Sequence, residues 1–437
     1  MRILKDKIGL LFAIMLPIIP LTFWYAMKPI GDRFSTMATT LTSLGQITGL
    51  LGLTLFSITL ILSARLKIFE IFFGSLDKVY KIHHKFGIVS FLFLLAHPLF
   101  LAFKYLILIS ASSAATFLLP SSDWAKNFGI ISLYLMMILL IITMFSAFRY
   151  QVLKSFHKFL GLAMFFGGLH AFLIPSDISE NQPLRIFMLS LASLGLAAYV
   201  YRTLLGKFFV KKFTYRVISV NNIKNDVVEI VMKPLVKKME YLPGQFIFIS
   251  FIYGNISSET HPFSISSAPH EESLKITIKN LGDYTSKMKT LQVGSIAKIE
   301  GPYGKFSYLN AYEKNQIWIA GGIGVTPFLN MMRNIKYNLY AGYSIDMYYC
   351  AKTANEIVFL DEFMEASKSV QGFKLIPYCS DEKGFLTTKN ILELSNGVKR
   401  KDILICGPPF MMNSLKEQFL KLKVPKYKIH LEEFKLL

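Results

Sequence analysis

The stretch "SFHKFLGLAMFFGGLH" (155–170) places two histidines thirteen residues apart in a segment that is otherwise apolar enough to lie in a lipid bilayer. An imidazole ring in hydrocarbon is costly unless it finds a partner, and ionisable residues in membrane helices commonly mark functional sites. The fold and the function of the chain therefore depend on what His157 and His170 bind.

The composition predicts a membrane part and a soluble part. The chain has 437 residues, of which 53% are hydrophobic, and a mean hydropathy of +0.43. Such a chain is too apolar to be wholly soluble. We expect a six-helix transmembrane bundle, because six apolar runs before residue 210 are long enough to cross a hydrocarbon core of roughly 30 Å. These runs are 8–27, 41–63, 82–109, 127–148, 156–174 and 184–204.

The basic residues predict the orientation of this bundle. One set of loops contains Arg2, Lys5, Lys7, Arg65, Lys67, Lys78, Lys81, Arg149, Lys154, Arg202, Lys207, Lys211 and Lys212. The opposite loops contain only Lys28, Arg33, Lys104 and Lys126. By the positive-inside rule, we expect both termini to lie in the cytoplasm. We expect a multi-pass protein of the plasma (inner) membrane. The net charge of +20 is then explained by topology and by the lipid bilayer as a partner, and no nucleic acid is expected.

The sequence after residue 212 is typical of a soluble module with two parts. Short β-type runs such as "FTYRVISV" and "QFIFISFI" predict a small antiparallel β-barrel. From about residue 312, strands alternate with helices, which predicts an α/β domain with a parallel sheet that binds ligands at the carboxyl ends of its strands. We therefore expect three domains, at 1–208, 209–310 and 311–437. The three cysteines, Cys350, Cys379 and Cys406, have no metal-ligand spacing and predict no disulfide.

The loop "AGGIGVTP" (320–327) follows a predicted strand and opens a predicted helix. Gly321, Gly322 and Gly324 would let the backbone approach a pyrophosphate closely, and the helix N-terminus would supply free N–H groups. A plain tight turn has the same composition, so this loop does not define a nucleotide site by itself.

Six motifs occur in the order found in ferredoxin-NADP reductase-like modules, and the resemblance covers residues 212–437. The motifs are "HPFSISSAP" (261–269), "IKNLGDYTSKM" (278–288), "GPYG" (301–304), "GGIGVTP" (321–327), "CGPP" (406–409) and "HLEEF" (430–434). The resemblance implies FAD and NAD(P)H as cofactors. The residues that it places at these cofactors are His261, Pro262, Phe263, Ser264, Lys279, Gly282, Thr285, Ser286, Gly321, Gly322, Gly324, Val325, Thr326, Pro327, Cys406, Gly407, Pro408 and Phe434.

The same resemblance gives some of these residues particular roles. Ser264 would lie near the flavin nitrogen that receives hydride, Cys406 beside the nicotinamide, and Phe434 over the flavin. His261 stands where arginine is common, so Lys279 would neutralise more of the FAD pyrophosphate charge. For Cys406 and Phe434 an ordinary place in the core is the alternative.

The donor is either NADH or NADPH, according to the contacts made to the ribose 2′-phosphate. Lys352 and Lys383 are plausible partners for that phosphate and favour NADPH, although exposed lysines are common.

The third apolar run, "IHHKFGIVSFLFLLAHP" (82–98), repeats the design of the fifth. Each run has a histidine near its start, a glycine four residues later and a histidine near its far end. At about 1.5 Å per residue, the two levels lie roughly 20 Å apart. Two histidines at one depth can supply both axial ligands of a haem iron. We therefore predict two haem b groups as further cofactors, with the metal ligands His83, His97, His157 and His170.

We choose His83 over His84 by helical angle. Fourteen residues at about 100° each bring His83 within roughly 40° of the face of His97, whereas His84 lies about 140° away. The argument has a weakness, because His157 and His170 are themselves thirteen residues apart. A single membrane histidine could instead only hydrogen-bond a neighbouring helix.

The paired histidines resemble the ferric reductase transmembrane domain shared by yeast-type iron reductases, NADPH oxidases and bacterial relatives. This resemblance implies that electrons pass from cytoplasmic NAD(P)H through FAD and the haems to a small-molecule acceptor outside, either dioxygen or ferric iron. Animal-type oxidases carry a further histidine one turn beyond the outer ligand, where this chain has Leu101.

Two alternatives remain open, together with the oligomeric state. One is a subunit that donates electrons to a periplasmic partner protein. The other is a transport protein whose histidines relay protons.

Overall fold

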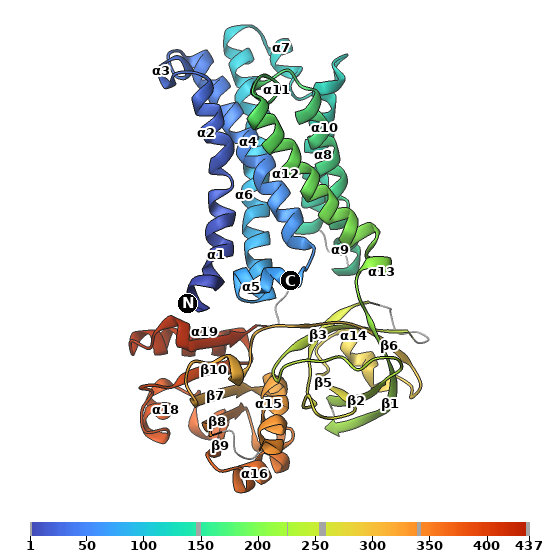
Figure 1. Ribbon diagram of the computed structural model, residues 1–437, viewed down its shortest axis with the longest axis vertical. Coiled ribbons are helices and arrows are strands. Elements are labelled where there is room, and N and C mark those ends of the chain that lie inside the picture. Colours follow the sequence, from blue (N-terminus) through green and yellow to red (C-terminus); the bar gives the residue numbers. More distant parts are fainter. Residues whose placement is uncertain (1, 146–149, 225, 253–258, 339–341, 434–437) are drawn as a thin grey trace. The chain divides into compact units, whose positions relative to one another are not determined.

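The computed structural model describes residues 2–145, 150–224, 226–252, 259–338 and 342–433. The chain forms two compact units, Met1–Val210 and Lys211–Leu437 (Figure 1).

The first unit contains, within the described residues, six helical segments that are long and apolar enough to cross a membrane, as predicted. The first consists of α1 (Arg2–Met15) and α2 (Ile18–Met27), and the fifth of α9 (Tyr150–Lys158) and α10 (Leu160–Leu173). The others are α4 (Met37–Ser63), α6 (Leu76–Leu108), α8 (Trp124–Phe145) and α12 (Gln182–Tyr199), which continues as a π-helical turn over Val200–Leu204. Short helices connect them: α3 (Ile30–Arg33), α5 (Lys67–Phe73), α7 (Ala111–Ala115), α11 (Asp177–Glu180) and α13 (Gly206–Phe209).

The third segment differs from its predicted bounds. It begins at Leu76 rather than at residue 82, so Lys78 and Lys81 lie on the helix and not in a loop. The extra turns form because Leu76 and Val79 are fully buried, which supplies an apolar face that the hydropathy of the segment does not reveal. The end of the predicted fourth run, 146–148, lies outside the described residues.

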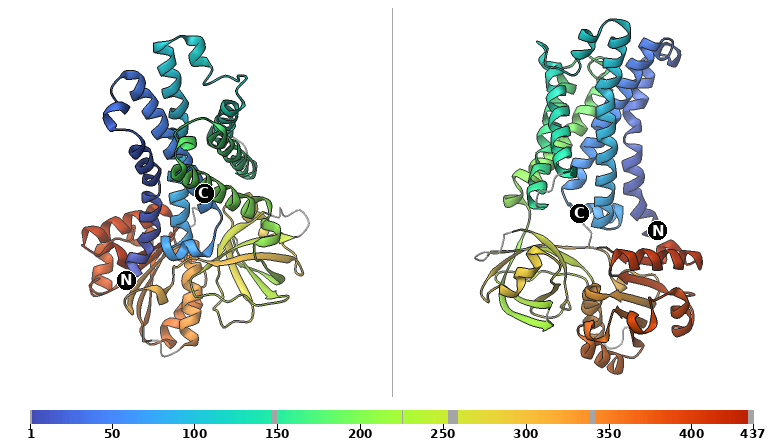
Figure 2. Two further views of the ribbon diagram at one scale, coloured as in Figure 1. Left: turned by 45° about the horizontal axis from the view of Figure 1, so that its top comes forward. Right: turned by 180° about the vertical axis from the view of Figure 1, so that it is seen from behind.

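Helix α4 packs against α6 on one side and α12 on another, and α8 packs against α10. Figures 1 and 2 show these long helices running side by side. The approach is close because glycines face the neighbouring helix. A Cβ at Gly195 of α12 would meet the Ser57 backbone of α4 at 3.0 Å, and one at Gly52 of α4 would meet Leu94 of α6 at 2.7 Å. Small residues of this kind allow membrane helices to pack backbone against backbone.

The second unit begins with the predicted antiparallel barrel. Its six strands are β1 (Phe213–Lys224), β2 (Val227–Pro234), β3 (Phe246–Ile252), β4 (His261–Ser264), β5 (Leu274–Lys279) and β6 (Ile296–Tyr303). They pair in the order β4-β3-β6-β1-β2-β5, and a bridge between Ile265 and Ile276 joins the two ends of the sheet. The short helix α14 (Asp283–Ser286) follows β5.

The rest of the second unit is the predicted α/β domain. Five parallel strands pair in the order β11-β10-β7-β8-β9. They are β7 (Asn315–Gly321), β8 (Ser344–Ala351), β9 (Phe373–Cys379), β10 (Asp402–Cys406) and β11 (Ile429–Glu432). The helices are α15 (Thr326–Tyr337), α16 (Leu360–Ser369), α17 (Ser380–Lys383), α18 (Thr388–Leu394) and α19 (Pro409–Lys421). Trp318, at the centre of β7, is fully buried between the layers.

Candidate redox site

The structure brings the four predicted membrane ligands together in two pairs. The rings of His83 on α6 and His157 on α9 have centroids 6.3 Å apart. The rings of His97 on α6 and His170 on α10 also lie 6.3 Å apart. His84 is exposed and belongs to neither pair. The structure therefore places His83, and not His84, opposite His157.

Three of the four rings have one nitrogen engaged by a backbone carbonyl of the neighbouring helix. Nδ1 lies 2.9 Å from the Thr59 oxygen for His83, 2.7 Å from the Gly45 oxygen for His97, and 2.7 Å from the Ala125 oxygen for His170. A carbonyl can only accept, so Nδ1 carries the proton and donates. Each Nε2 then keeps its lone pair, which is the form that a metal-binding histidine needs.

The geometry of the pairs fits a haem. A metal–imidazole bond is about 2 Å long and the ring centre lies about 1 Å beyond the bonding nitrogen, so two rings sharing one metal have centroids roughly 6 Å apart. Among the described residues, no group of three or more His, Cys, Asp or Glu side chains could hold a metal ion. A pair of histidines suffices for haem, because the porphyrin supplies the four remaining ligands.

Two glycines that belong to none of the motifs predicted from the sequence leave room for the rings of the second pair. A Cβ at Gly49 of α4 would meet Nδ1 of His97 at 2.8 Å, and a Cβ at Gly129 of α8 would meet Nδ1 of His170 at 2.9 Å. Each glycine lies four residues after the carbonyl that accepts from the same ring. The spacing Gly45-x-x-x-Gly49 is a signal for close helix packing that could have located one of these two contacts.

The poor angular match between His157 and His170 has a structural explanation. The helix is interrupted at Phe159, where Phe159 N–H bonds to Phe156 O and Leu162 N–H bonds to Phe159 O. These bonds span three residues, and such turns rotate by about 120° per residue instead of 100°. The tighter winding rotates His170 towards the face of His157.

The histidine-to-glycine spacing that the third and fifth runs share does not give the two glycines the same role. A Cβ at Gly161 would clash with Tyr199 at 2.3 Å, but one at Gly87 would meet only Thr59, at 3.7 Å. The two glycines therefore have different surroundings, although their spacing from the histidines is the same.

In the barrel, His261 of β4 stacks on Tyr284 of α14, with ring centroids 3.7 Å apart, and its Nε2 lies 3.1 Å from a Glu259 carboxylate oxygen. The Tyr284 hydroxyl is buried and has no hydrogen-bond partner among the described residues. Burial, with the charge of Glu259, raises the pKa of this phenol, so it stays protonated. A buried hydroxyl needs a hydrogen-bond partner, and a flavin bound beside the predicted motif would supply one.

The residues predicted at the FAD pyrophosphate all lie around α14. Lys279 is paired with Asp226 at 3.3 Å. The Thr285 hydroxyl accepts the N–H groups of Leu281 and Gly282, at 2.9 and 3.0 Å, and Ser286 donates to Asp283. The hydroxyls therefore shape the loop, and Lys279 remains the cation that could face phosphate. Ser264, Pro262 and Phe263 lie on β4, and Ser264 is buried.

The glycine loop and "CGPP" interlock at the carboxyl edge of the parallel sheet. A Cβ at Gly324 would lie 2.5 Å from the Cys406 oxygen, and one at Gly407 would lie 2.9 Å from the Cα of Gly321. Gly322 has nothing within 4 Å and a φ of +54°, so it is the glycine with an open side. Three of the glycines therefore serve backbone packing, whereas Gly322 leaves room for a ligand at the start of α15. Val325, Thr326 and Pro327 are buried, and Pro408 precedes α19.

Cys406 ends β10 and is fully buried. Burial, together with the charge of Glu432 on the adjacent strand β11, raises the pKa of the thiol well above its usual value. The side chain is therefore a neutral, compact neighbour for a ligand rather than a nucleophile. Phe434 lies outside the described residues.

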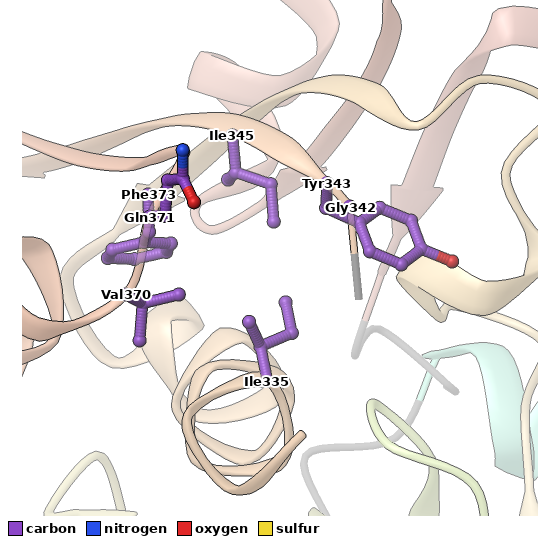
Figure 3. Close-up of a pocket in the computed structure, with 8 residues that line it drawn as sticks. Ile335, Gly342, Tyr343, Ile345, Val370, Gln371 and Phe373 are labelled. Carbon is purple, nitrogen blue, oxygen red and sulfur yellow. The ribbon is translucent and has the colours of Figure 1, made fainter. Parts of the chain in front are cut away.

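Figure 3 shows a hollow lined by Ile335, Tyr343, Ile345, Val370 and Phe373. It lies at the amino ends of β8 and β9, the edge of the sheet opposite to the glycine loop. Parallel sheets bind nucleotides at the carboxyl edge, so this hollow is not the nucleotide site.

Comparison with known proteins finds a family match in each of three parts of the chain. Residues 48–168 match the ferric reductase-like transmembrane component, 212–307 an FAD-binding domain and 318–417 an oxidoreductase NAD-binding domain. The reductase component of propane 2-monooxygenase from Mycolicibacterium goodii is 25% identical over 248 residues, 53% of this chain and 70% of that protein. A heavy chain of the superoxide-generating NADPH oxidase from Dictyostelium discoideum is 26% identical over 236 residues, 48% of this chain and 44% of that protein.

Among solved structures, a flavohemoglobin from Malassezia yamatoensis with bound FAD and haem has a TM-score of 0.50 at 18% identity, covering 81% of this chain and 98% of that one. At this identity the likeness concerns the fold alone.

Fold and site together define a multi-pass membrane oxidoreductase with FAD-binding and NAD(P)H-binding domains. The chain carries a ferric reductase-like transmembrane domain fused to a ferredoxin-NADP reductase-like module, the composition of the ferric reductase and NADPH oxidase superfamily.

Gly49→Ala should displace the His97 ring, because the new methyl group would lie 2.8 Å from Nδ1. If each histidine pair holds a haem, we expect roughly half of the b-type haem absorbance to be lost in this variant, while its melting temperature changes little, because alanine favours a helix over glycine by about 1 kcal/mol. Gly31→Ala, where nothing lies within 4 Å, is the control. Full haem content in Gly49→Ala would contradict this assignment.

Gly324→Ala should force the two nucleotide-edge loops apart, because its Cβ would lie 2.5 Å from the Cys406 oxygen. We expect NADPH to bind more weakly, with a dissociation constant at least tenfold higher than that of the unmodified chain, measured by fluorescence quenching. Gly322→Ala, which strains the backbone by only about 1–2 kcal/mol, should keep the loops in contact. If Gly324→Ala and the unmodified chain bind NADPH with equal affinity, the close contact between the glycine loop and the loop after Cys406 does not shape the nucleotide site.

Proposed function

We propose that the protein moves electrons from cytoplasmic NAD(P)H across the membrane to an extracytoplasmic acceptor. The observation that carries this proposal is that one helical bundle contains two pairs of histidines, and in each pair the ring centroids lie 6.3 Å apart. When bound, FAD takes up a hydride and passes on single electrons, which b-type haem iron carries one at a time.

The chain's own residues would hold these groups in a line. His83 and His157 would ligate one haem and His97 and His170 the other, with the two levels roughly 21 Å apart along α6. The carbonyls of Thr59, Gly45 and Ala125 would keep the imidazole tautomers fixed. From the distribution of basic residues we infer that the His83 level, and both termini with it, lie nearer the cytoplasm.

The paired geometry favours electron transfer over a proton relay. Rings with centroids 6.3 Å apart put their facing nitrogens roughly 4 Å from each other, which is too far for a hydrogen bond. Protons would need an additional carrier at each level, whereas a shared metal needs this separation.

We propose NADPH as the donor. Lys352 directly follows β8, and Lys383 ends α17 after β9, so both lie at the carboxyl edge of the sheet. A hydrogen bond from Asp381 N–H to Lys352 O, at 3.2 Å, joins the two loops. Either ammonium could then meet a ribose 2′-phosphate.

The acceptor is dioxygen or ferric iron, and the structure bears on this choice through Leu101. A Cβ at Gly45 would lie 2.9 Å from Leu101 Cδ2, so the Leu101 side chain packs on α4 one turn beyond His97. An apolar residue at this position supplies no proton donor to a reduced oxygen species. The likeness to a superoxide-generating oxidase keeps dioxygen as the second candidate.

His83→Ala should remove one haem, whereas His84→Ala should keep both, because the His83 ring lies 6.3 Å from the His157 ring and His84 is exposed. The measurement is the reduced-minus-oxidised absorbance spectrum of the full chain, with dithionite as reductant. His97→Ala should behave as His83→Ala does. Loss of haem in His84→Ala with retention in His83→Ala would reverse the assignment, and no Soret band in the unmodified chain would exclude the haem proposal.

The acceptor is tested with purified protein, FAD and NADPH. We expect brisk reduction of a ferric chelate that superoxide dismutase does not inhibit, with slow oxygen uptake. Oxygen uptake matched by dismutase-sensitive cytochrome c reduction would establish an oxidase instead. If both acceptors react slowly and a periplasmic protein fraction accelerates haem oxidation, the acceptor is a partner protein.

A further inference from the structure

One short segment of the barrel is shared between the barrel and the α/β domain. It consists of Ile265 and Ser266, which directly follow Ser264 in the predicted flavin motif. Their N–H groups donate into the barrel, from Ile265 to Gln245 O at 3.1 Å and from Ser266 to Lys275 O at 2.8 Å. Their carbonyls face the other way and accept from α15, from Asn330 Nδ2 at 3.1 Å and from Arg333 Nη1 at 2.9 Å.

Helix α15 also starts at the dinucleotide loop. Its first residue, Thr326, follows the glycine loop, and Asn330 and Arg333 lie one turn apart on one face. The distance from the start of the helix to Arg333 is about 10 Å at 1.5 Å per residue. Figures 1 and 2 show α15 between the parallel sheet and the barrel. One rigid element therefore contacts both predicted cofactor motifs.

The Arg333 side chain is held in a single orientation. Its Nε and Nη2 donate to the two carboxylate oxygens of Glu362 on α16, at 2.7 and 2.8 Å. Glu229 of the barrel lies 3.5 Å away, and the guanidinium lies over the Phe359 ring at 5.5 Å. The side chain is 13% exposed. A planar guanidinium can engage Glu362 and Ser266 together, and a lysine ammonium has no equivalent fork.

We propose that Asn330 and Arg333 are positioning residues for hydride transfer, which fix the flavin-lining segment relative to the dinucleotide loop through their common helix. The inference rests on the proposed function of the second unit. Reacting atoms must approach to about 3–3.5 Å, and a displacement of about 1 Å can lower the rate by roughly 100-fold. Neither residue needs to touch a cofactor to have this effect.

The chain offers a matched control. Lys336 of α15 pairs with Glu365 of α16 at 2.7 Å, so it joins the same two helices as the Arg333–Glu362 pair. Its carboxylate partner is 65% exposed, and exposed pairs contribute little to stability. Lys336→Met removes an ion pair between these helices but leaves the contacts with Ile265 and Ser266.

The test compares the full-length chain with Arg333→Lys, Asn330→Ala and Lys336→Met, by anaerobic stopped-flow with FAD and NADPH. We expect Arg333→Lys and Asn330→Ala to lower the limiting rate of flavin reduction about 10- to 100-fold, with the apparent dissociation constant for NADPH within about twofold. The long-wavelength charge-transfer absorbance between nicotinamide and flavin should weaken with the rate. Lys336→Met should match the unmodified chain in all three measurements.

A second readout needs no cofactor. In the cofactor-free full chain, amide hydrogen exchange of peptides spanning 261–268 should rise in Arg333→Lys and Asn330→Ala but not in Lys336→Met. Unchanged exchange and an unchanged charge-transfer band in both variants would overturn the inference. If Arg333→Lys is not recovered folded, Asn330→Ala decides the question by the same two measurements. Failure of NADPH to reduce flavin in the unmodified chain would instead remove the proposed function.

Discussion

A backbone acceptor for the N–H of a membrane imidazole fixes which of its two nitrogens keeps a lone pair for a metal, and three of the four paired histidines of the first unit have such an acceptor. The acceptors are backbone carbonyls of α4 and α8. A helix carbonyl can be reached only if the neighbouring helix lies very close. Gly45, Gly49 and Gly129 permit that approach. At His97 and His170, the position of the histidine therefore determines where a glycine is needed on the neighbouring helix.

Features that depend on the periodicity of apolar residues or on the order of motifs along the chain could be predicted from the sequence. It predicted the six spans, the barrel followed by the parallel sheet, and the choice of His83 over His84 for the face opposite His157. Hydropathy averages over both faces of a helix, so it could not show that Leu76 and Val79 extend the third helix.

Contacts that depend on tertiary packing could not be predicted in the same way. Gly49 and Gly129 acquire their role only when their helices meet a histidine. In the sequence alone, Asn330 and Arg333 look like ordinary polar residues of an amphipathic helix. The atoms that accept their hydrogen bonds are backbone oxygens some 65 residues away along the chain. The glycine loop lies between a strand and a helix, as predicted, but the structure divides its glycines between packing at Gly321 and Gly324 and an open side at Gly322.

The break at Phe159 gives the two histidine-bearing arms unequal parts in the architecture. Helix α6 is continuous from Leu76 to Leu108, so an insertion or deletion anywhere between His83 and His97 would rotate and shift one histidine relative to the other. The opposite arm consists of two helices that meet at a single residue. Insertions or substitutions near that junction can be absorbed by rewinding one turn. Insertions and deletions should therefore be tolerated between α9 and α10 but not within α6. The length of α6 then sets the spacing between the two histidine levels, and the junction at Phe159 adjusts to it.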